Sequence, residues 1–366
     1  MIRWLLALLL LSPRVPPDDM TDGQFGPYLQ NLTSTSIVVC WRTSTKSSSK
    51  VAVAGVTYSN PTPVQYHQVP ITGLSPNTAY AYTCSSTANG ATVFTGSGAF
   101  RTGVTGNTPY TFVAVGENHD EDEVATFQEE ILAANPLFML DASDQVDEGT
   151  DIREWDRFFT IGKEFFAKVP LFCAMGNHTY SPKKHTRTYR SVMNQPGNEE
   201  WYTFRQGNAQ FIVLNSTWYY SPIKLATSQV SWLVSTLQAA TDGVDDPKWI
   251  VAMMHIPPYS SGPWYREIPE RKWVRKFLMS KLEQYGVDLV IAGHDKFNEH
   301  SKKGNVHFAQ FATGLLSPKI QTTNPYKVWM DKDHRALGVC EVGADKITVR
   351  FVGNDGTVLH QFDVTE

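Results

Sequence analysis

The chain has little of what would indicate a nucleic-acid partner or a membrane protein. Its formal net charge is only −4, and 19% of its 366 residues are charged. Lys and Arg form no continuous basic stripe, so we do not expect it to bind nucleic acid. Beyond the first residues no segment is apolar enough to span a bilayer, which requires about 20 residues. We therefore expect a soluble mature chain without stable membrane insertion.

Cysteine is also scarce, with four residues in the whole chain. Cys40 alternates with Val39 and Trp41 and so points to the opposite face of its predicted strand. Cys84 lies in phase with Tyr82, on the face that should be buried. A bridge between Cys40 and Cys84 would join opposite sides of one layer, so we expect four free thiols that act as small hydrophobic residues.

The first residues have the pattern of a signal peptide. Arg3 precedes the apolar run Trp4–Leu11, and prolines follow it. Residues 1–19 are therefore predicted to be a leader, and the mature protein to be secreted or periplasmic. A buried strand, or a true start at Met20, is the alternative.

With 42% hydrophobic residues, the chain is long and apolar enough for two ordinary domains. Residues 20–104 contain short β-rich runs separated by turn residues, which is typical of a β-sandwich. After the Gly- and Thr-rich spacer Thr102–Pro109, apolar strands alternate with helical stretches, which predicts an α/β core in residues 109–366. The C-terminal end is predicted to be an antiparallel meander closing a second sheet, with strands Ala336–Val342, Ile347–Val352 and Val358–Val364.

Polar clusters directly follow the predicted strands of the second region. Because ligands bind beyond the carboxyl ends of strands in α/β sheets, the clusters should meet in one crevice. Carboxylate, carboxamide and imidazole groups together suit Zn, Fe or Mn. The clusters are Glu117-Asn118-His119, Asp144, Asn177-His178, His255 and His294.

Three of these clusters lie in recognisable sequence blocks. Gly176-Asn177-His178, Met254–Gly262 and Gly293-His294-Asp295 resemble the last three of the five motif blocks of the calcineurin-like metallophosphoesterases. Two N-terminal segments, Gly26–Gln30 and Gly73–Tyr82, resemble the small domain of purple acid phosphatases and fibronectin type III modules. The resemblance implies an N-terminal β-sandwich followed by a four-layer αββα metallophosphoesterase domain.

The resemblance also implies roles for the site residues. Family members hold two metals that clamp an in-line displacement at phosphorus and activate a water molecule. Asp144 would bridge the two metals, with Asn177, His255 and His294 completing the second site. His178 would stabilise the phosphoryl oxygens or protonate the leaving oxygen.

The first metal site departs from the family pattern. Glu117 replaces the usual Asp, whereas His119 keeps the usual carboxylate-x-His spacing. Lys296 replaces a His ligand, and a protonated ammonium has no lone pair to give a metal. Asp147 stands where the purple enzymes place their iron-binding Tyr. We therefore expect one tightly held metal and a second that is weak or absent.

We interpret the chain as an acid phosphatase-like phosphomonoesterase acting on a phosphorylated small molecule or phosphoprotein, with reduced activity. One alternative is a catalytically impaired relative that binds a metal or a phosphorylated ligand. Another is an extracellular adhesion or carbohydrate-binding protein that uses the N-terminal region. The sequence does not indicate an oligomeric state.

Some polar and aromatic residues have less specific readings. A lone His at a strand end is more often a hydrogen-bonded surface residue than a ligand. This interpretation is favoured for His119, His185, His300 and His307, although His119 also has the spacing of a metal ligand. Trp264 and Tyr265 are candidates for the border of the substrate cleft.

Overall fold

The computed structural model describes residues 23–366, apart from residues 120, 143, 263–268 and 318–323. The predicted leader, Trp264 and Tyr265 lie outside the described residues, and the leader stays a prediction. Among the described helices, none combines the length and the hydrophobicity needed to cross a bilayer.

The N-terminal region is β-rich, as predicted, but its strands are longer than the sequence pattern indicated. Strand β2 is 18 residues long, because its first half pairs with β1 and β3 while its second half pairs with β3 and β4. Register shifts between Arg42 and Ser49 allow this change of partners. The strands are β1 (Phe25–Gln30), β2 (Ser36–Val53), β3 (Val56–Thr72), β4 (Ala79–Ala88) and β5 (Ala91–Arg101).

One 11-stranded sheet runs through both halves of the chain. Its order is β18-β17-β16-β6-β7-β8-β1-β2-β4-β5, with β3 on β2. The junction is the parallel pair of β1 and β8, in register at Gln30 and Leu171. Because β1 hydrogen-bonds to strands of both halves, the division into two domains at the spacer stays a prediction. The C-terminal half supplies β6 (Tyr110–Val115), β7 (Met139–Asp141), β8 (Leu171–Cys173), β16 (Leu337–Val342), β17 (Ile347–Val352) and β18 (Val358–Val364).

The C-terminal meander is confirmed as three antiparallel strands. The prediction that it closes a second sheet is wrong, because β16 pairs with β6 and extends the first sheet.

A second sheet of seven strands has the order β15-β13-β14-β12-β11-β10-β9. Its centre is parallel, from β10 through β11 and β12 to β14. Its strands are β9 (Tyr202–Gln206), β10 (Ala209–Leu214), β11 (Trp249–Met254), β12 (Leu289–Ala292), β13 (Asn298–Lys303), β14 (Val306–Gln310) and β15 (Lys327–Asp331).

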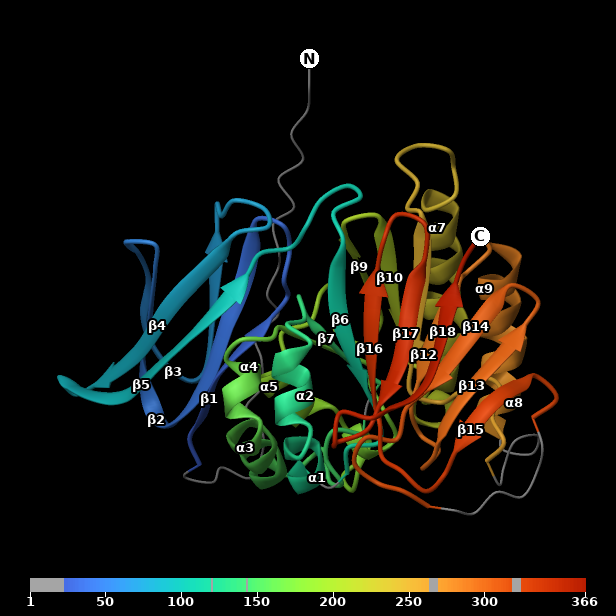
Figure 1. Ribbon diagram of the computed structural model, residues 1–366. Helices are drawn as coiled ribbons and strands as arrows, with labels where there is room; N and C mark the ends of the chain where they lie inside the picture. The colour runs from blue at the N-terminus through green and yellow to red at the C-terminus, as the bar shows by residue number, and fades with distance from the viewer. Residues whose placement is uncertain (1–22, 120, 143, 263–268, 318–323) are drawn as a thin grey trace.

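Helices cover the outer faces of the two sheets and complete the predicted αββα layers (Figure 1). Helices of the first set pack on the first sheet: α1 (Glu121–Ala125), α2 (Gln128–Ala133), α3 (Ile152–Ile161), α4 (Lys163–Phe166), η1 (His178–Tyr180) and α5 (Arg187–Val192). The other set follows β10: η2 (Trp218–Tyr220), α6 (Pro222–Lys224), η3 (Leu225–Gln229), α7 (Val230–Ala239), α8 (Pro269–Trp273), η4 (Val274–Met279) and α9 (Ser280–Gln284).

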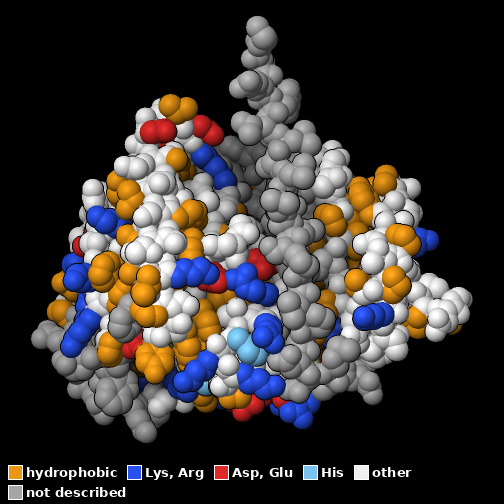
Figure 2. Space-filling model, turned by 180° about the vertical axis from the view of Figure 1, so that it is seen from behind, with side chains coloured by type: hydrophobic (Ala, Val, Ile, Leu, Met, Phe, Trp, Pro, Cys, Tyr) orange, Lys and Arg blue, Asp and Glu red, His pale blue; other side chains and the backbone are white. Residues whose placement is uncertain are grey.

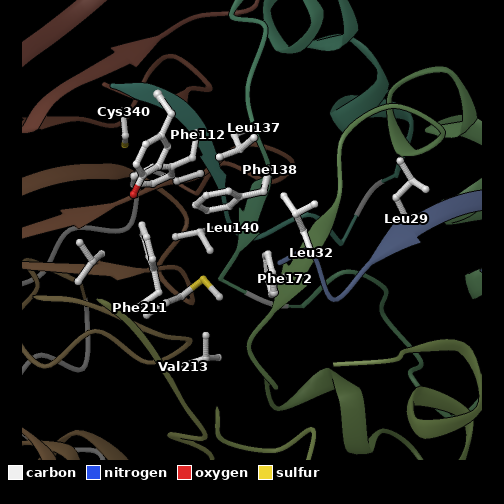
Figure 3. Packing of buried hydrophobic residues seen from close by; sticks show 14 of the residues in the cluster. Leu29, Leu32, Phe112, Leu137, Phe138, Leu140, Phe172, Phe211, Val213 and Cys340 are labelled. Carbon is white, nitrogen blue, oxygen red and sulfur yellow. The ribbon is translucent and has the colours of Figure 1, made fainter. Parts of the chain in front are cut away.

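The main hydrophobic core lies between the two sheets (Figure 3). Phe138 is at its centre and meets Phe172 and Phe211 edge-on, with ring centroids 5.6 and 5.2 Å apart. Leu29 and Leu32, from β1 and the loop after it, belong to the same cluster. The β-rich region therefore shares its core with the α/β region.

The four cysteines are free and buried. Cys84 faces the cluster between the sheets, whereas Cys40 faces the cluster under the helices. The alternation predicted from the sequence thus places these two thiols on opposite faces of the sheet.

The surface location predicted for His300 and His307 is wrong. Both are buried, at 3% and 6% exposure. His300 hydrogen-bonds to His360 of β18 at 2.9 Å and to His307 at 3.0 Å, and its ring stacks on Phe362. The chain of three imidazoles lies where the edge strand β18 of the first sheet meets β13 and β14 of the second.

Candidate metal centre

The ends of strands from both sheets bring the predicted ligands together. In one group, ligand atoms of Glu117, Asp144, His255 and His294 all lie within 4.8 Å of one another. A second group joins His119 and His178 to Asp144 within the same distance. Asp144 therefore belongs to both groups, which is the position that a bridging carboxylate requires.

Three of these residues have unusual backbone conformations. Glu117, Asp144 and His294 have φ angles of 56°, 51° and 67°. Non-glycine residues rarely occupy this left-handed region, and such strain concentrates at functional sites. Glycines precede two of them: a Cβ added to Gly116 would lie 3.1 Å from Cα of Gly293, so the two loops approach closely only without side chains.

His255 occupies the centre of the cluster and is buried. Its Nε2 lies 3.0 Å from both Asp144 Oδ2 and Asn177 Oδ1, and 3.1 Å from His294 Nδ1. Its Nδ1 lies 3.0 Å from the carbonyl oxygen of Ala142, and donation of a proton there leaves Nε2 with a lone pair facing the cluster.

Glu117 has the property expected of a metal ligand. Its carboxylate is buried, and neither oxygen accepts a hydrogen bond among the described residues. His119 Nε2 lies 3.1 Å from Oε2, but without hydrogen-bond geometry. Burial raises the pKa of Glu117, and the negative charge of Asp144 raises it further, against the lowering effect of His119. His119 partly neutralises this buried carboxylate, and a bound cation would neutralise it more fully.

His294 is ready to bind a metal because it stays neutral. Burial lowers the pKa of His294 to about 3. Metal ligation requires the neutral imidazole, so no proton has to be displaced at neutral pH.

The opposite side of the cluster is more open. The side chain of His178 is 32% exposed and that of Asp147 is 59% exposed. The His178 amide donates to Asp144 Oδ1 at 3.0 Å, and its Nδ1 hydrogen-bonds to the Asp147 carbonyl oxygen at 2.7 Å. Burial lowers the pKa of His119, but Glu117 and Asp144 outweigh this effect and raise it to about 9.

Lys296 lies two residues beyond His294 and is half-buried. Its carbonyl oxygen accepts a hydrogen bond from Ser317. Within the described part of the chain, no carboxylate oxygen lies within ion-pair distance of its ammonium group. That this ammonium replaces a metal therefore stays a prediction.

Two buried pairs beside the site were not predicted. Asn118 donates to Asp141 at 2.9 Å and so points away from the ligand cluster. Arg271 of α8 pairs with Asp295, directly after His294, and Ser260 also donates to Asp295. The only sequence signal for either pair is that a polar residue adjoins a ligand, which does not identify its partner.

The comparisons with known proteins agree with this geometry. The family model for calcineurin-like phosphoesterase matches residues 110–296. Purple acid phosphatase 13 of Arabidopsis thaliana is 27% identical over 75% of this chain and 55% of its own length. Human acid phosphatase type 7 is 28% identical over 47% of this chain and 41% of its own length.

A solved structure shows the same fold. The purple acid phosphatase from yellow lupin seeds superposes with a TM-score of 0.78 over 94% of this chain and 74% of its own, at 16% identity. The chain spans about half the length or less of the curated relatives named here. The candidate ligands follow the strands in the predicted order, and the family model spans these strands. The chain therefore belongs to the calcineurin-like phosphoesterase family.

Proposed function

We propose that the protein is a metal-dependent hydrolase of phosphate monoesters. The observation that carries this proposal is the position of Asp144, whose carboxylate belongs to both groups of potential ligands. A shared carboxylate is the feature that a two-metal phosphoesterase site needs.

The residues fit a metal centre of Zn, Fe or Mn. Asp144, Asn177, His255 and His294 would hold the tightly bound ion, and Glu117 and His119 would contribute to the weaker position. When bound, the metal would supply Lewis-acid stabilisation of charge at phosphorus and a water molecule acidic enough to attack it.

His178 is the residue of this chain best placed to handle the leaving oxygen. Its amide is fixed to Asp144 and its Nδ1 to the Asp147 carbonyl oxygen, so the ring is held in one orientation. Nε2 is then the nitrogen available to hydrogen-bond a phosphoryl oxygen or to pass a proton to the leaving group.

Positive charge beside the site favours an anionic substrate. Lys183 and Lys184 lie in the loop after η1, Arg187 begins α5, and all three are exposed. Seen from behind, Lys and Arg side chains gather around histidines in the lower half of the surface (Figure 2). This charge supports a phosphorylated small molecule or phosphoprotein as the substrate, and the leader-like residues 1–19 support export.

The test compares two variants with the wild type. Asp144→Asn should lose bound metal and the hydrolysis of a chromogenic phosphate ester, because it weakens the only carboxylate common to both groups. Asp245→Asn is the control, since that side chain is 90% exposed and remote from the ligands. Full activity of Asp144→Asn at wild-type metal content would refute the proposal.

A second candidate is a catalytically impaired protein that binds metal or a phosphorylated ligand. It is favoured by Glu117 and Lys296, which replace the usual ligands of the first metal position. Metal binding with no hydrolysis of any phosphate ester, in the wild type, would select this candidate.

A further inference from the structure

Three tyrosines form a ladder that leads from the candidate metal centre to the solvent. The rings of Tyr180 and Tyr220 stack with centroids 4.4 Å apart and an angle of 2° between their planes. Tyr219 packs edge-on against Tyr220 at 5.5 Å. Tyr180 is 5% exposed, Tyr220 is half-buried and Tyr219 is 63% exposed. We call Tyr180, Tyr220 and Tyr219 the tyrosine ladder.

The inner end of the ladder is fixed to the metal centre. Tyr180 ends the short helix η1 that begins with His178, whose amide is bonded to Asp144. The Tyr180 hydroxyl accepts a hydrogen bond of 3.0 Å from Asn215, which follows β10. The Tyr180 ring then stacks on Tyr220, which connects the ladder to the helix that begins at His178.

The outer end offers an aromatic surface to a ligand. Most of the Tyr219 side chain is in contact with solvent, and its ring packs edge-on against Tyr220. Ile223, in the adjoining helix α6, is 80% exposed. Rigid aromatic side chains beside a polar centre bind planar groups at a low cost in conformational entropy.

From this arrangement we propose that Tyr219 and Tyr220 select phosphate esters with an aromatic leaving group, whose ring packs on Tyr219 while the phosphoryl group lies beside His178. This inference rests on the proposed phosphoester hydrolysis. Water adds its oxygen to phosphorus while the bond from phosphorus to the aryl oxygen breaks. The electron pair of that bond goes to the aryl oxygen, which takes a proton, and the products are a phenol and inorganic phosphate.

The experiment compares phenyl phosphate with glycerol 2-phosphate in the wild type, Tyr219→Ala and Tyr219→Phe. Tyr219→Ala should raise KM for phenyl phosphate by about fivefold to tenfold, because one aromatic contact is lost, and leave kcat unchanged. Neither constant should change for glycerol 2-phosphate, and Tyr219→Phe should behave as the wild type. An equal rise in KM for both esters, or no rise in KM for phenyl phosphate, would overturn the inference while leaving the proposed function intact.

A second readout does not depend on turnover. Phenylphosphonate should bind the wild type more tightly than methylphosphonate does, and Tyr219→Ala should remove most of this difference. If no ester is hydrolysed, the proposed function fails, and the two phosphonates still decide whether the ladder binds aromatic rings. A phosphotyrosine peptide, used as a third substrate, distinguishes a protein-bound aryl ester from a small one. If Tyr219→Ala raises KM for both the peptide and phenyl phosphate, the site recognises the aryl ester that they share. If it raises KM for phenyl phosphate alone, the site selects small phenolic esters.

Discussion

Glu117, Asp144 and His294 each hold their side chains in the cluster from a left-handed backbone position. Such conformations cost free energy and persist only where the surrounding structure requires them. The loops that carry Glu117 and His294 approach each other closely at Gly116 and Gly293, where an added Cβ would lie about 3 Å from neighbouring backbone atoms. The backbone strain at these three residues is therefore a feature of the candidate metal centre.

The double variant Glu117→Asp with Lys296→His tests the account of the weak metal position. Asp is tolerated in the left-handed region better than Glu, and His restores a neutral nitrogen ligand in place of an ammonium. We expect a second metal per chain by elemental analysis and a rise in turnover of about tenfold or more. A wild type that already binds two metals per chain, or a double variant that gains neither metal nor turnover, would contradict this account.

At the same scale, the sequence identified the ligand types but not their neighbours. Asp144, Asn177, His255 and His294 could be predicted because each follows an apolar strand and lies in or near a short motif. The pairing of Arg271 with Asp295 could not, since the partners lie on different elements and only packing brings them together. The ladder was missed because nothing in the local sequence indicates that Tyr180 stacks on Tyr220.

At the scale of elements, the long β2–β3 hairpin was harder to predict than the α/β core. Strands β6 and β11 are almost continuously hydrophobic, which is typical of strands buried on both faces and makes them easy to recognise in the sequence. In β2, polar residues around Ser47 interrupt the apolar pattern. They mark the region where partners change, not the end of the strand.

Strand β5 makes a close contact with the α/β region. A Cβ added to Gly98 would lie 2.2 Å from the carbonyl oxygen of Ala167 and 2.6 Å from the Tyr82 hydroxyl. Gly98→Ala should therefore lower the free energy of unfolding by about 1 to 3 kcal/mol through overpacking. Chemical denaturation would measure this loss.

The matched control is Gly343→Ala. A Cβ there would lie 3.4 Å from the carbonyl oxygen of Lys346, an ordinary contact distance, and the backbone φ is not positive. The control should change stability little. Equal stability of Gly98→Ala and the wild type would show that β5 does not pack closely against the loop at Ala167.

The chain of imidazoles between β13, β14 and β18 should make stability depend on pH. Burial lowers the pKa of His300 to about 3 and that of His307 to about 4, and it also lowers the pKa of His360. In the unfolded chain these pKa values return to about 6.5. The unfolded state then binds more protons, so the stabilisation is complete above pH 6.5 and is lost as the pH falls through 6 and 5 towards 4.

Thermal melts between pH 8 and pH 5 test this dependence. His300→Phe keeps a ring against Phe362 but removes a titrating group, so its melting temperature should fall less than that of the wild type over this range. His334→Gln, at an exposed loop position, is the control: Asp331 raises the pKa of His334, so removing this imidazole should not reduce the fall in melting temperature at low pH. Parallel pH profiles for the wild type and His300→Phe would mean that the imidazole chain does not set the dependence.

At the scale of the whole molecule, the β-rich region and the α/β region share one sheet and one core. Strand β1 pairs with β8, and Tyr28 stacks on Phe159 of α3 with ring centroids 3.9 Å apart. Removal of β1 would expose the edge of β8 and the apolar surface of α3. We therefore predict that residues 109–366 alone do not form a soluble, cooperatively melting monomer.

Expression of that fragment beside the full chain would check the prediction. Calorimetry of the full chain should show a cooperative transition, and the fragment should aggregate or melt without one. A fragment that melts cooperatively as a soluble monomer would show that the two regions fold independently.

The most direct test of the central claim measures bound metal and phosphate release in the same samples. The full chain is treated with a chelator, Zn²⁺, Mn²⁺ or Fe²⁺ is added back in steps, and elemental analysis is paired with hydrolysis of a phosphate ester. The account predicts no hydrolysis by the chelated chain and a return of activity in proportion to metal bound. Full activity in the chelated chain would contradict it, and so would a chain that neither binds any of these metals nor hydrolyses any phosphate ester.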